Sequence, residues 1–260
     1  MTVVLAGIGA DTTNVGALGR LYDDGTFDYV PIPEKTQQTT ETETFGTWEL
    51  RDGRAAATIT NRIRPRPIAE SELIIRGDAL SNWPVHHDPN FEALTYGEHR
   101  HGYVSAIETL EPGDAVGFYA GLRPTAGGRA HRYLIGLFTV SAVEVIAPTV
   151  DDESVAAIFS RHPDNAHTKR AVDGRPYLRE KRVVIVDGRE PGGLLESDPI
   201  RLSEYVTKPG NSRPQYYLRP EVGRALDVRS GRENMQFKPA YRCGIDADRF
   251  REWIEERERA

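Results

Sequence analysis

Apolar residues fall into short runs that predict strands, interspersed with helices in no regular alternation. Residues 3–9 and 183–186 are brief apolar runs with the length of a buried strand. Residues 115–122 and 131–146 are longer runs, rich in apolar and aromatic side chains, and a loop with a Gly-Gly pair lies between them. These two runs predict a hairpin of long strands.

Helical spacing appears in three places. Residues 103–110 carry apolar side chains on one side, and Asp151 is placed to cap a helix that extends to residue 159. Near the end of the chain, an apolar stripe predicts a helix over about 247–258. The order of elements predicts an α+β fold with a mixed or antiparallel sheet, which could close partly into a barrel, and flanking helices.

We expect a single domain over residues 1–260, because no repeat or linker divides the sequence. A polar insertion interrupts it at about 37–67. The insertion begins with a loop-like run of Thr, Gln and Glu and ends in the extended, basic stretch Arg-Ile-Arg-Pro-Arg-Pro.

Composition narrows the functional classes. The 260 residues carry 33 basic and 39 acidic side chains, a net charge of -6, and only five of the basic residues are lysine. This balance opposes a chain-wide basic footprint for nucleic acid but leaves room for local arginine patches, which suit phosphates and carboxylates. No apolar run approaches the length of a membrane helix, and the first residues lack a basic leader, so we expect a cytoplasmic protein with no membrane partner.

All seven histidines lie between His86 and His167. Imidazole titrates near neutrality and binds borderline metals, so a metal site is one interpretation. The other is a set of loop and surface histidines that hydrogen-bond to the backbone. Cys243 is the single cysteine, so any metal site would use His, Asp and Glu, and the sequence contains no strong cofactor motif.

Three further segments contain candidate groups. Asp11 follows the first strand in a glycine-rich turn, where it could act as a base or ligand or cap the turn. Tyr119 lies in the aromatic hairpin, which forms either a base-binding pocket or simply core. Lys208 and Arg213 flank a late polar loop that suits an anion or remains solvated.

Motifs in the same order along most of the chain resemble the nucleotide modification associated domain family, type three. They are Gly9-x-Asp11, Asp24-Gly25 with Pro31-Ile32-Pro33-Glu34, His86-His87-Asp88-Pro89-Asn90, Gly113-Asp114 with Phe118-Tyr119-x-Gly121-x-Arg123, the strand from His131 to Val140, His162-Pro163 with Asn165, and Ser212-Arg213 with Leu218-Arg219-Pro220. Asn90 replaces the second aspartate of its motif, which removes one carboxylate from a metal site there. The resemblance implies a role in modifying nucleotides or nucleic-acid bases.

Our leading hypothesis is an enzyme, or enzyme-like component, that acts on a nucleobase or nucleotide by group transfer or by hydrolysis of a glycosidic bond. Under this hypothesis, the catalytic residues are Asp11, His86, Asp88, His162 and Asn165. The residues that bind substrate or phosphate are Tyr119, Arg123, His131, Lys208 and Arg213. The alternative is a non-catalytic reader that holds a modified base in an aromatic pocket of the hairpin. A purely structural or metal-binding domain is a third possibility.

The basic stretch adds a prediction about polymers. If residues 62–66 are extended, Arg62, Arg64 and Arg66 share one face and form a row suited to backbone phosphates. The competing interpretation is that this row pairs with the acidic stretch at 41–49.

Overall fold

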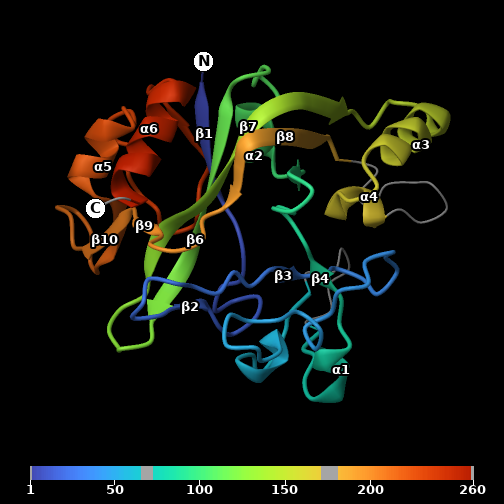
Figure 1. Ribbon diagram of the computed structural model, residues 1–260, viewed down its shortest axis with the longest axis horizontal. Coiled ribbons are helices and arrows are strands. Elements are labelled where there is room, and N and C mark those ends of the chain that lie inside the picture. The colour runs from blue at the N-terminus through green and yellow to red at the C-terminus, as the bar shows by residue number, and fades with distance from the viewer. Residues whose placement is uncertain (1, 66–72, 171–180, 259–260) are drawn as a thin grey trace.

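The computed structural model of the chain, which describes residues 2–65, 73–170 and 181–258, confirms the predicted α+β class (Figure 1). A mixed sheet curls into a half-barrel, and helices lie at its two ends. The strands are β1 (Val3–Gly7), β2 (Gly19–Leu21), β3 (Ile32–Pro33), β4 (Val85–His86), β5 (Thr95–Glu98), β6 (Ala115–Pro124), β7 (His131–Ile146), β8 (Val183–Leu194), β9 (Ile200–Arg201), β10 (Ser203–Val206), β11 (Gln215–Leu218) and β12 (Tyr241–Cys243).

The main sheet has the order β12-β1-β6-β7-β8-β5. Strand β1 is parallel to β6, and the other neighbouring pairs along this path are antiparallel. The predicted hairpin is β6–β7, and β7 continues past it to pair with β8 from Ile146↔Val183 to Gly136↔Leu194. Strands β2 and β9 join β6 and β7 at the sides, while β3–β4 and β10–β11 form small separate sheets.

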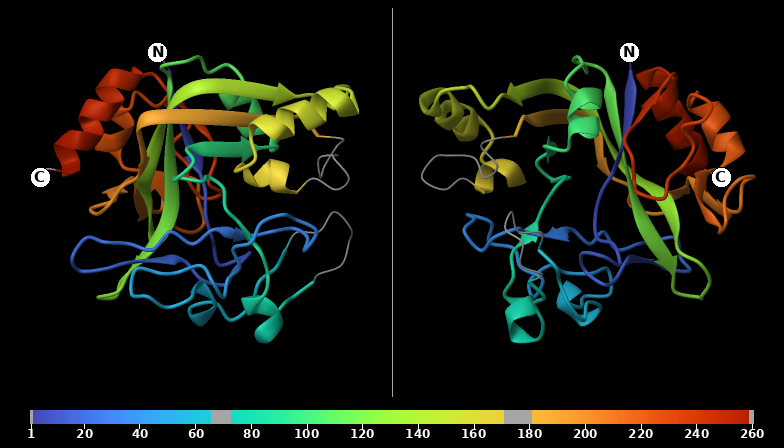
Figure 2. Two further views of the ribbon diagram at one scale, coloured as in Figure 1. Left: turned by 45° about the vertical axis from the view of Figure 1, so that its right-hand side comes forward. Right: turned by 180° about the vertical axis from the view of Figure 1, so that it is seen from behind.

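The helices are α1 (Asp78–Ser81), α2 (His101–Ile107), α3 (Asp152–Arg161), α4 (Ala166–Lys169), α5 (Pro220–Ala225) and α6 (Ala247–Glu258), with a 3-10 turn at Ala56–Thr58. Asp151 caps α3 as predicted, because its side chain accepts a hydrogen bond from the Ser154 N–H. Figures 1 and 2 show α5 and α6 on one side of the β6–β7 hairpin and β3, β4 and α4 on the other.

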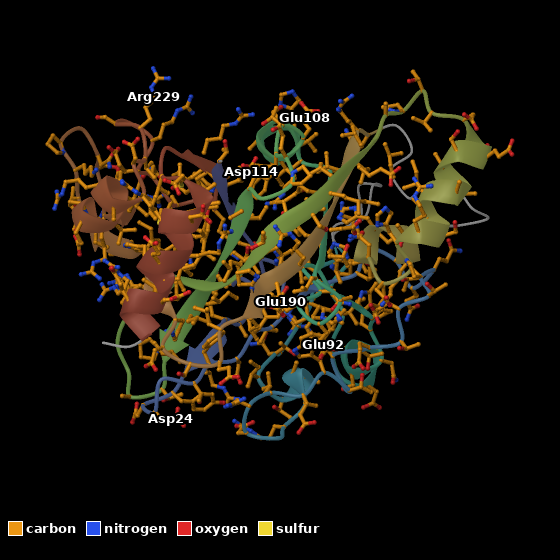
Figure 3. All side chains as sticks on the ribbon, turned by 45° about the horizontal axis from the view of Figure 1, so that its top comes forward. Asp24, Glu92, Glu108, Asp114, Glu190 and Arg229 are labelled. Carbon is orange, nitrogen blue, oxygen red and sulfur yellow. The ribbon has the colours of Figure 1, made fainter. Side chains whose placement is uncertain are left out.

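The main core lies along the central strands. Phe118 and Phe138 are fully buried, and their rings pack edge to face with each other and with Phe91. Phe250 of α6 is also fully buried, against the other face of β6 near Gly117. The charged residues Asp24, Glu92, Glu190 and Arg229, which Figure 3 labels, are exposed. The sheet therefore has two packed faces.

The segment expected as a polar insertion has a core of its own. Phe45 and Ile63 are fully buried, and they pack in one cluster with Trp83 and Val85. The segment is largely irregular, but its apolar residues anchor it beneath β3 and β4. None of the helices in the described ranges is long and apolar enough to cross a membrane.

Candidate functional site

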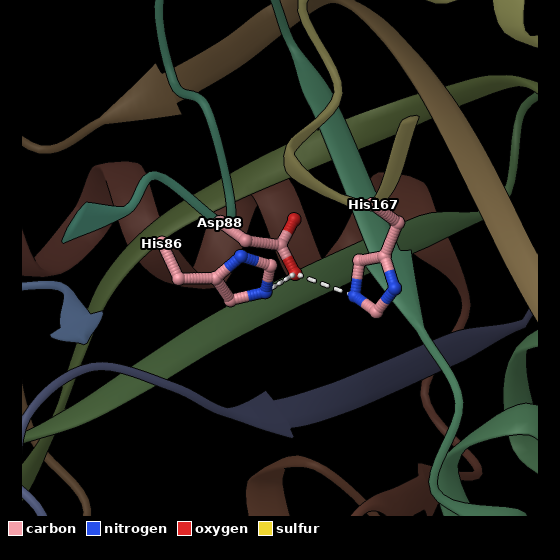
Figure 4. Close-up of side chains that lie close together, drawn as sticks. All are labelled: His86, Asp88 and His167. Atoms are coloured by element: carbon pink, nitrogen blue, oxygen red, sulfur yellow. Dashed lines mark ion pairs between the residues drawn. The ribbon is translucent and has the colours of Figure 1, made fainter. Parts of the chain in front are cut away.

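Two groups of polar side chains stand out, and the first is a buried group that we call the histidine cluster: His86, Asp88 and His167 (Figure 4). One oxygen of Asp88, Oδ2, lies 3.5 Å from Nε2 of His86 and 3.6 Å from Nε2 of His167. The three residues are 4%, 8% and 8% exposed. Two imidazoles therefore face the same carboxylate oxygen away from solvent.

Local structure fixes each member of the histidine cluster. Asp88 follows β4, and its other oxygen, Oδ1, accepts a hydrogen bond of 2.8 Å from the Gly97 N–H of β5. His167 lies on α4, which Asn165 caps by accepting a hydrogen bond from the His167 N–H. Asn165 also donates from Nδ2 to Thr95 Oγ1, which ties α4 to β5. Strand β5 thus aligns the carboxylate and one of the imidazoles.

Gly97 is required by this packing. A Cβ atom at Gly97 would lie 2.3 Å from Cδ2 of His167 and 2.9 Å from Oδ1 of Asn165. The imidazole of His167 therefore packs directly on the backbone of β5, and a side chain at position 97 would displace it.

A second layer holds the histidine cluster. Nδ1 of His86 lies 2.7 Å from Oε1 of Glu34, and the buried Arg170 donates from Nε to both oxygens of Glu34 at 2.8 and 2.6 Å. Burial by itself raises the pKa of Glu34, but Arg170 and His86 outweigh burial and lower that pKa to about 2. Burial likewise opposes the charge of Asp88, yet His167 and His86 hold the pKa of its carboxyl well below the ordinary value. Both carboxyls are ionised at neutral pH.

The second group lines a cavity of about 450 Å³ that we call the arginine pocket. Its wall is formed by Asp11, Thr12, Leu18, Arg123, Gly128, Arg129, Ala130, Arg132, Tyr216 and Gln236. These residues come from the loop after β1, the tip of the β6–β7 hairpin, β11 and the segment before β12. A cavity of this volume lies within the range of about 300–1,000 Å³ that small-molecule sites occupy.

Cations and aromatic rings alternate around the arginine pocket. The guanidinium of Arg132 lies 4.6 Å from the ring centre of Tyr216, and that of Arg129 lies 4.0 Å from the ring centre of Tyr205. Nε of Arg132 is buried and has no hydrogen-bond partner among the described residues. The ammonium of Lys208 stacks on Tyr217 at 4.3 Å. Such interleaving is typical of surfaces that bind bases and phosphates.

One carboxylate, that of Asp11, lines the pocket among these cations. Asp11 Oδ1 accepts hydrogen bonds from the N–H groups of Thr13 and Asn14, while Nζ of Lys238 lies 4.0 Å from Asp11 Oδ2. Burial opposes the charge of Asp11, but Lys238 and the hydrogen bonds lower the pKa of its carboxyl below the ordinary value. Lys238 also donates to the carbonyls of Ile8 and Gly9 at the end of β1, and burial lowers its own pKa to about 7.

The predicted catalytic residues are divided among three places. His86 and Asp88 meet in the histidine cluster, whereas Asp11 lies in the arginine pocket, and no hydrogen bond or ion pair between described residues joins them. His162 lies between two carboxylates: its Nδ1 is 3.0 Å from Oδ1 of Asp187, and its Nε2 is 2.8 Å from Oε2 of Glu144. Asn165 caps α4 and so positions His167.

The predicted substrate-binding residues are also spread out. Arg123 lines the arginine pocket, and beside the pocket His131 lies 2.7 Å from the Arg201 guanidinium. Lys208 stacks on Tyr217, and Arg213 is exposed in the adjacent loop. Tyr119 is fully buried and donates its hydroxyl hydrogen to the Pro239 carbonyl, so the aromatic hairpin packs as core here.

Two members of the basic row, Arg62 and Arg64, lie beside the loop that contributes Asp11 to the arginine pocket. The backbone N–H of Arg64 donates to the carbonyl of Asn14, and the side chain of Arg62 packs near Gly16. Among the described residues, neither side chain forms an ion pair with the acidic stretch at 41–49. Arg66 lies outside the described residues.

Sequence reasoning missed His167, Glu34 and Arg170 in the histidine cluster, and Arg129, Arg132, Tyr216 and Gln236 in the arginine pocket. The sequence does contain a feature that points to His167: it ends the His-Pro-Asp-Asn-Ala-His segment and follows an asparagine able to cap a helix. The others are brought together only by tertiary contacts.

A sequence model of the family described as nucleotide modification associated domain 3 matches residues 2–251, which is nearly the whole chain. No curated protein and no solved structure shows significant similarity to the chain.

Proposed function

Because the chain belongs to the nucleotide modification associated domain 3 family, we propose that it binds a nucleotide in the arginine pocket and acts in nucleotide modification. The observation that carries this proposal is the composition of the pocket wall, which combines three guanidiniums with one carboxylate and one tyrosine ring. A nucleotide offers a matching group for each of these.

Each group in the pocket wall matches one part of a nucleotide. Arg123 and Arg129 are exposed at the tip of the hairpin, where their guanidiniums are able to clamp a phosphate. Tyr216 provides a ring on which a base stacks. Asp11 caps its own turn through Oδ1, and its carboxylate repels a bare phosphate, so the wall favours a ligand that also brings a hydrogen-bond donor.

Asp11 fits a hydrogen-bond acceptor for the substrate. Its lowered pKa makes it a weak general base, but the ionised carboxylate accepts well from a base amino group or a sugar hydroxyl. In this function Asp11 orients the nucleotide, and the protein works as an enzyme or enzyme-like component of the modification pathway.

The test is calorimetry with deoxynucleoside monophosphates, compared with the matching nucleosides and with inorganic phosphate. We expect the monophosphate to bind at least about tenfold more tightly than either fragment, because only it engages both Arg129 and Tyr216. Arg129→Gln should weaken binding about tenfold or more through loss of a charge-assisted contact. Arg182→Gln, which removes an exposed arginine that pairs with Glu108, is the matched control. Equal affinity for phosphate and nucleotide would refute the proposal.

The basic row supports a longer ligand. Arg62 and Arg64 are partly exposed and lie beside the loop that carries Asp11, so they add positive charge near the pocket. A single-stranded oligonucleotide should therefore bind with an affinity that falls steeply with salt, and replacing Arg62, Arg64 and Arg66 by Gln should flatten that slope. An unchanged slope would limit the ligand to a free nucleotide.

A further inference from the structure

We propose that His86, Asp88 and His167 bind one divalent transition-metal ion. Among the residues that the structure describes, this is the one group of His, Cys, Asp or Glu side chains whose ligand atoms converge, all within 4.8 Å of one another. Figure 4 shows the two imidazoles approaching the same oxygen of Asp88 from opposite sides.

The separations suit an ion better than direct hydrogen bonds. A charge-assisted N–H···O bond is about 2.7–2.9 Å long. The two Nε2–Oδ2 separations are 3.5 and 3.6 Å, too long for such bonds. Two ligand atoms that each lie about 2.1 Å from a tetrahedral Zn²⁺ are about 3.4 Å apart. Oδ2 of Asp88 already stands at about this distance from both imidazole nitrogens, and all three ligand atoms lie within 4.8 Å of one another.

Hydrogen bonding also directs the lone pairs toward the same point. Nδ1 of His86 donates to the Glu34 carboxylate at 2.7 Å, so a neutral His86 presents the lone pair of Nε2 to Asp88. A carboxylate behind a metal-binding histidine commonly fixes this tautomer. Oδ1 of Asp88 is held by the Gly97 N–H, which leaves Oδ2 for the ion.

His162 is a useful comparison, because it also lies between carboxylates but forms direct hydrogen-bond contacts with them. Its two ring nitrogens lie 3.0 Å from Asp187 and 2.8 Å from Glu144, and both distances are hydrogen-bonding distances. The histidine cluster combines the same residue types, but its carboxylate and imidazoles are held apart.

Charge balance points the same way. Glu34 and Asp88 are buried anions, and Arg170 is the buried cation that touches Glu34. Asp88 has no guanidinium or ammonium among its contacts in the described parts of the chain. A buried carboxylate needs a counter-charge, which either protonated imidazoles or a divalent ion between neutral imidazoles supplies. The separations of 3.5 and 3.6 Å favour the ion. Two imidazoles and one carboxylate suit Zn²⁺, Fe²⁺ or another divalent first-row ion.

The test uses full-length protein stripped with a chelator and titrated with Co²⁺, whose visible absorption reports coordination. We expect one equivalent to bind, with bands of a His and carboxylate environment. Asp88→Asn and His167→Gln should each weaken binding by about 100-fold or more, whereas His162→Gln should leave it unchanged. Wild-type protein that binds no Co²⁺, or Asp88→Asn that binds it as tightly, would overturn the proposal.

Thermal melting keeps the test decisive if a variant folds poorly. Zn²⁺ at about 100 times its Kd should raise the Tm of the wild type by about 5–10 °C and leave the Tm of Asp88→Asn unchanged. A wild-type Tm that Zn²⁺ leaves unchanged would defeat the proposal, because the two imidazoles would then satisfy Asp88 without an ion.

Discussion

The arginine pocket and the histidine cluster both use strands of the main sheet, but one exposes its charges and the other buries them. Arg123 and Arg129 are exposed, so water screens them until an anion arrives. Glu34 and Arg170 are 1% exposed, so their charges must be balanced inside the protein. A substitution that removes a charge from the arginine pocket should therefore weaken ligand binding. A substitution that removes a charge from the histidine cluster or its supporting residues should also lower the stability of the protein.

The largest expected effect comes from breaking the buried pair behind the histidine cluster. Arg170→Met leaves Glu34 buried with His86 and the Lys35 N–H as its described partners and removes its buried cation, so it should lower the free energy of unfolding by about 3–5 kcal/mol. Denaturant unfolding measures this. The matched change Arg182→Met breaks an exposed pair with Glu108 and should cost less than about 1 kcal/mol. Similar losses in both variants would contradict the distinction between the two regions.

A pair of glycine substitutions tests the same contrast sterically. Gly97→Ala puts a Cβ 2.3 Å from the rigid imidazole of His167, so it should destabilise the protein by about 1–3 kcal/mol and weaken Co²⁺ binding. Gly121→Ala puts a Cβ 2.8 Å from Nη1 of Arg132, the far end of a flexible side chain. It should change nucleotide affinity severalfold with little effect on Tm. Loss of Co²⁺ binding in Gly121→Ala would show that the two regions are coupled.

The smallest effect concerns pH. Burial and the neighbouring Arg201 lower the pKa of His131 to about 4, so this imidazole is neutral at pH 7. A bound phosphodiester should raise the pKa of His131, so affinity should increase as pH falls from about 6.5 toward 4. A thymidine dinucleotide is the suitable probe, since neither its phosphodiester nor its bases titrate in this range. His131→Gln should remove the increase, and the exposed His101→Gln should retain it.

Local patterns were sufficient for the elements that depend on local chemistry. The apolar runs placed β1, β6 and β7, and the cap at Asp151 placed α3. The length of β8 was underestimated, because its second half from Asp187 is polar and is held in the sheet by pairing with β7. Two-residue strands such as β3 and β4 have no periodicity to detect.

The sites show the same limit. His86 and Asp88 are neighbours in sequence, so their motif was visible, but their partners come from residues 34, 97, 167 and 170. Within the segment 162–167, spacing alone could not decide which histidine turns inward. The cap at Asn165 decides it by directing α4, and with it His167, against β5.

The position of β12 near the end of the chain has a consequence for folding during synthesis. Strand β1 pairs on one edge with β6 and on the other with β12, and Gln236 and Lys238 lie just before β12. On the ribosome, every residue of the histidine cluster therefore emerges before the arginine pocket has its last wall. Until Tyr241–Cys243 arrives, the outer edge of β1 lacks its backbone partners and is open to pairing with other nascent chains.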